Sequence, residues 1–207
     1  SDLAHLAVRL PAEDIPRLKK DARLQLDSTE TLRVLYVGFN CQKKPFSDVR
    51  VRQAFNLATD RDSIVRNLYR GRALPASNIV APRTTGYVPL PAHPYDPEKA
   101  KKLLAEAGYP NGLKARFISP MGRYPKDYEM AQALQQQWKQ AGIEVSLGTM
   151  EWAAYLAATR KPVDQTDVEI FLLGWAPSSA EARWILYPLY HSDQWVPKGN
   201  NRIFYAN

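Results

Sequence analysis

The chain has 207 residues, 45% of them hydrophobic, and a formal net charge of +7 from 28 Lys and Arg against 21 Asp and Glu. This length is enough for one α/β domain with a substantial core, and the sequence shown contains neither an apolar run of roughly 18 residues nor a basic-then-apolar leader, so we expect no transmembrane helix or signal peptide within it. Its single cysteine, Cys41, excludes an internal disulfide framework and a Cys-based zinc site, and we expect it to be a half-buried residue at a strand end.

The first residues form a segment that leads into the domain. The apolar stretch Leu3–Leu10 is typical of a strand whose partner lies outside this sequence, and residues 12–21 have the pattern of a short helix. We therefore expect residues 1–31 to be a truncated leading segment. Residues 32–40, rich in Val, Leu, Tyr and Phe, predict a strand that ends at Asn40.

Two helices are expected after this strand. The first begins at a cap, Ser47 or Asp48, and the second begins at Asp60 and ends at Gly71. Apolar residues recur with helical spacing in both, and they are Val51, Phe55 and Ala58 in the first and Ile64, Val65 and Leu68 in the second.

A proline-rich loop and a short helix come next. Residues 73–94 contain too many prolines for regular structure, but their embedded apolar residues indicate a loop that packs over the domain. A helix is predicted at residues 97–107, because Asp96 can cap it, Pro97 suits its first position and Gly108 can adopt the left-handed conformation that ends it.

The rest of the chain alternates strands with helices. Such alternation is typical of βαβ units, so the sequence predicts an α/β fold with a mixed, largely parallel sheet flanked by helices. Residues 168–173 form an almost continuous apolar run, which we place in the middle of the sheet, covered on both faces. The predicted strands are 113–118, 143–147 and 168–173, and the predicted helices are 127–141, 152–159 and 180–190.

The end of the predicted central strand is the first candidate for a ligand site, because ligands of open α/β sheets bind beyond the carboxyl ends of the strands. Gly174, Trp175, Ala176 and Ser178 lie there. Glycine lets a backbone come close, tryptophan offers a flat apolar face, and serine hydroxyls with free N–H groups can bind an anion or a peptide group. Trp175 could equally be a core aromatic at a strand end, and the residues alone leave both interpretations open.

No catalytic, metal-binding or cofactor-binding constellation emerges. His5, His93 and His191 are far apart and lack metal-ligand spacing, and no phosphate loop or nucleophile elbow occurs. Asp60 and Asp62 flank Arg61, an arrangement that favours helix-cap and ion-pair roles over an acid/base pair. We therefore expect no enzyme activity, no cofactor and no metal.

The basic net charge leaves an alternative, an independent anion- or nucleic-acid-binding module. Lys and Arg are scattered singly or in short pairs, however, and no nucleic-acid module signature accompanies them, so we expect no nucleic-acid partner. A continuous basic stripe on the surface would favour the alternative. A concave patch of Trp175, Tyr124 and small residues would favour a small-molecule site.

Several sequence blocks point to one protein family. They are N-x-x-x-K-P-F at 40–46, V-R-Q-A at 51–54, Y-D-P-E-K-A-K-K-L-L-A-E-A-G-Y-P-N-G at 95–112, G-R-Y-P-K-D at 122–127, G-I-E-V at 142–145 and G-W at 174–175. In this order they closely resemble the peptide, dipeptide and nickel type of extracytoplasmic solute-binding protein of ABC importers. The resemblance covers about residues 32–207.

The resemblance implies the second lobe of a type II periplasmic-binding-protein-like fold. In such receptors a ligand is captured in a cleft between two lobes, trapped by hinge closure and delivered to a membrane permease. We expect residues 32–207 to be this ligand-binding lobe, a single α/β domain, with the first lobe absent. The implied partners are a peptide-like ligand, the permease and the missing first lobe, and the implied location is periplasmic, or extracytoplasmic and membrane-associated.

The resemblance also bears on the ligand. Many peptide-binding relatives have an Asp three residues after the Gly-Trp tryptophan, where this chain has Ser178. Residues 174–184 resemble the glutathione-binding members, except that Arg183 stands where an acid is usual, so we expect a di- or oligopeptide-like solute, with glutathione as one candidate. The expected ligand-binding residues are Gly174, Trp175, Ala176, Ser178, Arg123, Tyr124 and Asn40.

Overall fold

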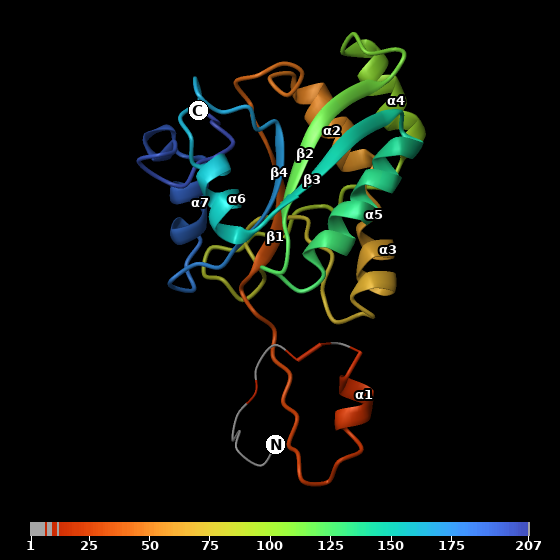
Figure 1. The fold of residues 1–207 in the computed structure, drawn as a ribbon, viewed down its shortest axis with the longest axis vertical. Helices are drawn as coiled ribbons and strands as arrows, with labels where there is room; N and C mark the ends of the chain where they lie inside the picture. The colour runs from red at the N-terminus through yellow and green to blue at the C-terminus, as the bar shows by residue number, and fades with distance from the viewer. Residues whose placement is uncertain (1–6, 8–9, 12, 207) are drawn as a thin grey trace.

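Four strands form one sheet in the order β1-β4-β2-β3 (Figure 1). The computed structural model describes residue 7, residues 10–11 and residues 13–206. β2 runs parallel to β3 and β4, whereas β1 runs antiparallel to β4, so the prediction of a mixed, largely parallel sheet is confirmed. The strands are β1 (Val34–Phe39), β2 (Leu113–Pro120), β3 (Ile143–Met150) and β4 (Ile170–Trp175).

β4 lies between β1 and β2, as its continuous apolar sequence predicts. Its side chains alternate between two layers, with Ile170 and Leu172 in one apolar cluster and Phe171 and Leu173 in another. None of the four is more than 3% exposed. Full burial of an aliphatic or aromatic side chain is worth roughly 1.5–3 kcal/mol, so this strand anchors both halves of the core.

One face of the sheet is covered by α2 (Val49–Leu57), α4 (Pro97–Glu106) and α5 (Asp127–Gln140) (Figure 1). The predicted caps are confirmed: the Asp48 carboxylate accepts from the Arg50 N–H and the Asp96 carboxylate from the Lys99 N–H. Gly108, just after α4, has a φ of 97°, the left-handed conformation that the sequence predicts. These helices pack on the sheet around Trp138, which is 1% exposed.

The second predicted helix is confirmed at its start and differs further on. Asp60 caps α3 (Arg61–Ser63) by accepting from the Ser63 N–H, and the chain then continues as a π-helical turn, η1 (Ile64–Leu68). The Tyr69 N–H donates to Ile64 O, five residues back, which gives this turn its wider hydrogen-bond spacing.

The opposite face is covered by α6 (Trp152–Thr159), α7 (Arg183–Tyr190) and the segment from the short 3-10 helix η2 (Ser192–Gln194) to residue 206 (Figure 1). The predicted loop at 73–94 packs here, since its Val80 joins an apolar cluster with Ile185 and Leu189 of α7. Helix α7 begins three residues later than predicted. Ala180 and Ala182 use their backbone groups to pair with Thr85 of this loop, which holds them out of the helix.

Residues 13–33 precede β1 and extend away from the sheet at the end where β1 begins (Figure 1). They include α1 (Ile15–Leu18), the central turn of the helix predicted at 12–21. An ion pair between Lys126 Nζ and Glu13 Oε1, at 3.3 Å, joins them to the body. The strand expected at Leu3–Leu10 lies mostly outside the described residues. Among the helices that are described, none has the length and apolar character needed to span a membrane.

Candidate ligand-binding site

The carboxyl ends of β2, β3 and β4 lie side by side at one end of the sheet. We call this end of the strands the carboxyl edge. Pro120 pairs with Met150 there, and Trp175 lies opposite Val34, the first residue of β1. Residues 13–33 therefore leave the domain at this same edge (Figure 1). All of the predicted ligand-binding residues except Asn40 lie on the strand ends or loops of the carboxyl edge.

A buried carboxylate shapes the loop after β2. Asp127 is 3% exposed, and its side chain accepts from the backbone N–H groups of Gly122, Arg123 and Tyr124 at 3.0, 2.8 and 2.9 Å. It also accepts from the Tyr128 N–H at 2.9 Å. Such charge-assisted bonds offset the cost of burying the carboxylate and fix the loop on the first turn of α5. The loop thereby holds Arg123 and Tyr124 at the carboxyl edge.

Tyr124 packs directly on the backbone of β4. Its hydroxyl donates to Gly174 O at 3.2 Å, and the residue is 6% exposed. A Cβ added at Gly174 would lie 2.8 Å from Tyr124 Cε1 and 2.7 Å from Leu35 Cδ2. Glycine at this position therefore admits two side chains of the domain itself.

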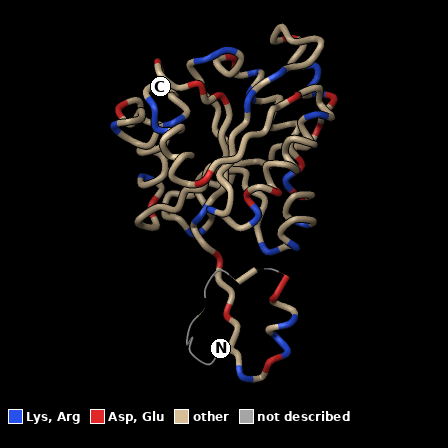
Figure 2. Tube along the Cα trace, in the orientation of Figure 1, with Lys and Arg blue, Asp and Glu red and all other residues tan. Residues whose placement is uncertain are grey.

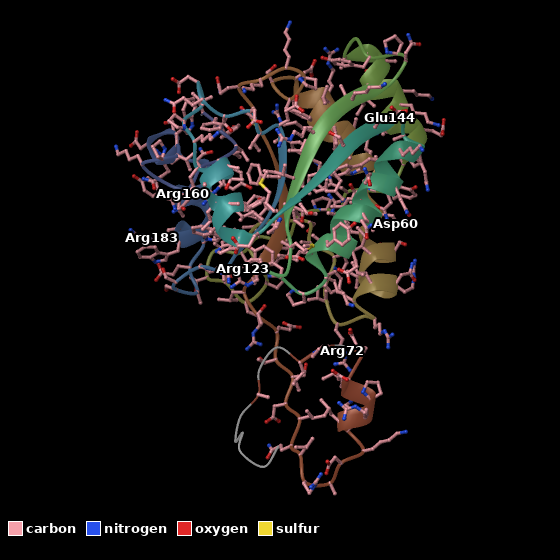
Figure 3. The ribbon with its side chains drawn as sticks, viewed as in Figure 1. Asp60, Arg72, Arg123, Glu144, Arg160 and Arg183 are labelled. Carbon is pink, nitrogen blue, oxygen red and sulfur yellow. The ribbon has the colours of Figure 1, made fainter. Side chains whose placement is uncertain are left out.

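Two guanidinium groups lie over aromatic rings at the carboxyl edge. The Arg123 Cζ is 4.6 Å from the ring centroid of Trp152 and 5.8 Å from that of Tyr124, and the Arg33 Cζ is 5.7 Å from the Tyr124 centroid. Figure 3 shows Arg123 at the lower end of the sheet. Both arginines are exposed, and within the described part of the chain neither forms an ion pair. An exposed cation on an aromatic platform suits a planar anionic group such as a carboxylate.

Trp175 is half-buried and held in place. Its indole N–H donates to Trp184 O at 3.0 Å, and its ring packs against the cluster of Val80, Ile185 and Leu189. The polar end of the side chain is therefore used inside the domain, which leaves only apolar ring surface for a ligand. The internal packing agrees with an aromatic at a strand end, and a role of Trp175 in ligand binding stays a prediction.

The loop after Trp175 is tied to the proline-rich loop. The Thr85 N–H donates to Ala180 O at 2.8 Å, and the Ala182 N–H donates to Thr85 O at 2.9 Å. Ala176 and Ser178 are exposed in the stretch between Trp175 and this anchor. The stretch is thus fixed at both ends, with its small side chains open to solvent.

Asn40 lies at the opposite edge, because β1 runs antiparallel to β4 and ends beside the start of β4. The residue is 1% exposed, its Nδ2 donates to Val168 O at 3.3 Å, and its Oδ1 accepts from the Gln42 N–H at 3.1 Å. These bonds give Asn40 a structural role there. The structure does not bring it together with the other predicted site residues.

Trp152 and Arg33 were not predicted from the sequence. Trp152 lies two residues after the end of β3, so the rule that places ligands beyond strand ends would have found it if applied to every strand. Arg33 precedes β1, and its place at the carboxyl edge depends on the antiparallel direction of that strand, for which the sequence carries no signal.

The described residues contain no group of three or more His, Cys, Asp or Glu side chains that could hold a metal ion. Cys41 is half-buried just after β1, and burial raises the pKa of its thiol, which keeps it protonated and unreactive near neutral pH. Asp60 serves as the cap of α3, so its carboxylate has the structural role that the sequence favours.

Comparison with protein families matches residues 3–196 to "Bacterial extracellular solute-binding proteins, family 5 Middle". The glutathione-binding protein GsiB of Escherichia coli (strain K12) is 34% identical over 205 residues, which are 99% of this chain and 40% of that protein. The heme-binding protein A of Haemophilus influenzae is 37% identical over 183 residues, 86% of this chain and 33% of that protein.

Comparison with solved structures also finds periplasmic binding proteins. The periplasmic binding protein DppA from Helicobacter pylori, in complex with the peptide STSA, matches with a TM-score of 0.85 and 31% identity, over 95% of this chain and 37% of that one. The expectation of a type II periplasmic-binding-protein fold is thereby confirmed.

This chain spans about 40% of the length of the glutathione-binding relative that it matches. The relatives are binding proteins and not enzymes, in agreement with the lack of a catalytic constellation in the sequence. The chain belongs to family 5 of the bacterial extracellular solute-binding proteins.

Proposed function

We propose that residues 32–207 are the ligand-binding lobe of a two-lobed receptor that serves an ABC importer. A peptide-like solute binds between the carboxyl edge and the first lobe and is then passed to a membrane permease. The supporting observation is that half-buried aromatic rings and exposed guanidinium groups lie together at the edge where residues 13–33 leave the domain. The complete protein works outside the cytoplasm, in the periplasm or attached to the membrane.

The chemistry of the carboxyl edge supports a solute that carries a carboxylate. Arg123 supplies an exposed guanidinium on the Trp152 ring, and Trp175 supplies apolar surface with its N–H already bonded. The glutathione, heme and peptide named for the relatives differ in shape, yet each carries at least one carboxylate. Ser178 contributes a small neutral side chain that leaves room for the ligand. Glutathione is one candidate within this class.

The charge distribution favours this proposal over a nucleic-acid-binding module. Figure 2 shows Lys and Arg spread around the molecule and interspersed with Asp and Glu, without a continuous basic stripe in this view. Several of the cations are paired, including Lys101 with Glu98 at 2.7 Å and Lys114 with Glu144 at 3.7 Å.

Calorimetric titration of the two-lobed protein tests the proposal. The probes are glutathione, a dipeptide, the tetrapeptide Ser-Thr-Ser-Ala, a nickel chelate and a short oligonucleotide. We expect at least one peptide-like probe to bind, and Arg123→Ala to weaken that binding about 10-fold or more, because a hydrogen-bonded ion pair with the ligand is lost. Lys114→Ala is the matched control, since Lys114 lies at the other end of the same strand, β2.

Salt-sensitive binding of the oligonucleotide alone would contradict the proposal and favour the nucleic-acid-binding module. Equal losses for Arg123→Ala and Lys114→Ala would also count against it, since they would show that charge acts from any position and that the carboxyl edge is not the site.

A further inference from the structure

The face of the sheet under α6 and α7 contains two separate apolar clusters. The cluster under α6 includes Tyr155 and Phe171, and the cluster under α7 includes Ile185 and Leu189. Tyr36 of β1 packs against both. The boundary between the clusters, which we call the seam, therefore runs past the tyrosine side chain of Tyr36.

A buried cation lies by the seam. Arg202 is 7% exposed, and its Nη1 donates to Asn200 O at 3.2 Å. Its Nε is buried and has no hydrogen-bond acceptor among the described residues, and none of their carboxylates forms an ion pair with it. Burying an uncompensated guanidinium is costly, so a receptor that retains one requires a counter-charge from elsewhere.

Among the described residues, the groups that act on Arg202 include no carboxylate. The charged and titratable groups whose fields act on Arg202 are the hydroxyls of Tyr36, Tyr155 and Tyr124 and the guanidinium of Arg160, at the carboxyl end of α6 (Figure 3). Burial raises the pKa of the Tyr36 and Tyr155 hydroxyls, which keeps both neutral, and burial lowers the pKa of the Arg202 guanidinium. The Tyr124 hydroxyl already donates to Gly174 O and the Tyr155 hydroxyl to Leu172 O, so among these three the Tyr36 hydroxyl is the neutral donor that can serve an anionic oxygen group beside the guanidinium.

The seam is continuous with the candidate ligand-binding site. Tyr155 stacks on Trp152, with ring centroids 5.6 Å apart and an interplanar angle of 13°, and Trp152 is the ring over which Arg123 lies. Tyr36 and Trp152 are only half-buried, so solvent reaches the seam at both residues. A ligand on the Trp152 ring is therefore one aromatic layer away from the Tyr155 end of the seam.

We propose that Arg202 forms an inner anion subsite, which binds a second carboxylate of a ligand whose first carboxylate pairs with Arg123. The solute class is then a peptide-like dicarboxylate. Tyr36 supplies a hydroxyl donor beside the guanidinium, and Trp152 supports the part of the ligand between the two charges. This inference rests on the proposed function, because it takes the carboxyl edge as the place where ligand enters.

Paired probes that differ by one carboxylate test the subsite in the two-lobed protein. The pairs are glutathione with its monoethyl ester and Ala-Ala-Glu with Ala-Ala-Gln, measured by calorimetry. We expect the dicarboxylate of each pair to bind about 10- to 100-fold more tightly than its partner, and Arg202→Met to abolish this preference. Arg202→Lys, which keeps the charge without the forked donors, retains part of it.

Arg160→Met is the matched control, because it removes a positive charge near Arg202 from the end of α6. It keeps the preference for dicarboxylates. A wild-type protein without this preference, or an Arg202→Met protein that retains it, would overturn the inference and leave the proposed function intact.

A second measurement does not depend on peptide binding. In the ligand-free protein, Arg202→Met leaves the melting temperature unchanged or raises it, because an unpaired buried charge is removed. Succinate raises the melting temperature of the wild type and not that of Arg202→Met. A fall of several degrees for ligand-free Arg202→Met would overturn the subsite, since it would show that the charge of Arg202 already stabilises the ligand-free fold. Failure of every peptide probe with a positive succinate result would overturn the proposed peptide ligand alone.

Discussion

The residue type at position 174 is decided by the space that neighbouring side chains occupy. The Tyr124 ring and a Leu35 methyl fill the space that a Cβ would need, and the Tyr124 hydroxyl is bonded to Gly174 O. The ring cannot move aside freely, because its backbone is held by Asp127. Glycine at the end of β4 is therefore a packing requirement of the candidate site.

We predict that Gly174→Ala destabilises the chain by about 1–3 kcal/mol, the range for overpacking a well-filled core, as measured by urea unfolding. The control is Gly148→Ala in β3, where an added Cβ would be 3.8 Å from its nearest neighbour, Ile118 Cγ2, in ordinary contact. The control changes the free energy of unfolding little. Equal effects of the two substitutions would contradict the packing argument.

The sequence predicts individual residues only where the reason is local. Trp175 follows a recognisable strand, so its place at the carboxyl edge could be predicted. The role of Arg202 could not, because its burial and its tyrosine neighbours come from strands and helices far away in the sequence. Asn40 lies apart from the other predicted site residues for a related reason, because the direction of β1 in the sheet is a tertiary property.

At the scale of elements, the connection between β2 and α5 is the loop of the candidate site that a buried carboxylate holds by several hydrogen bonds. Asp127 belongs to α5 yet bonds to three backbone N–H groups of the preceding loop. Removing its carboxylate leaves these donors without their acceptor and frees the loop that carries Arg123.

We predict that Asp127→Ala lowers the free energy of unfolding by about 2 to 3 kcal/mol, the size of a lost hydrogen bond to a charged group, because the freed N–H groups regain water on the opened loop. Urea unfolding measures this change. Asp164→Ala is the control, since Asp164 is exposed in a loop. A loss no larger than that of the control would show that the loop holds its shape without the carboxylate.

Helix boundaries could be predicted from the sequence where they depend on capping residues within the same turn. Asp48 and Asp96 begin helices as predicted, and Gly108 ends one, because each acts on its own turn. The late start of α7 depends on Thr85, almost one hundred residues earlier in the chain, and could not be predicted. The π-helical turn in η1 likewise has no signal in the apolar spacing, which fits both helix types.

At the scale of the whole molecule, the candidate binding residues lie at the carboxyl edge, where the chain also leaves the domain. The parallel strands end at the carboxyl edge, and β1 begins there, so the chain passes to residues 13–33 beside the candidate site. A first lobe attached through that segment would face Arg123, Trp152 and Trp175. The relatives are about two and a half times as long as this chain, which leaves room for such a lobe.

Hydrogen–deuterium exchange of the two-lobed protein, with and without a saturating peptide-like ligand, tests most directly whether the carboxyl edge is the binding surface. We predict slower exchange on ligand binding in residues 121–128 and 175–184, which form the loops of the carboxyl edge, and no change in α4, which lies on the other side of the domain. Protection confined to α4 or to residues 110–114 at the opposite edge, or no protection anywhere in residues 34–206, would contradict a ligand-binding site at the carboxyl edge.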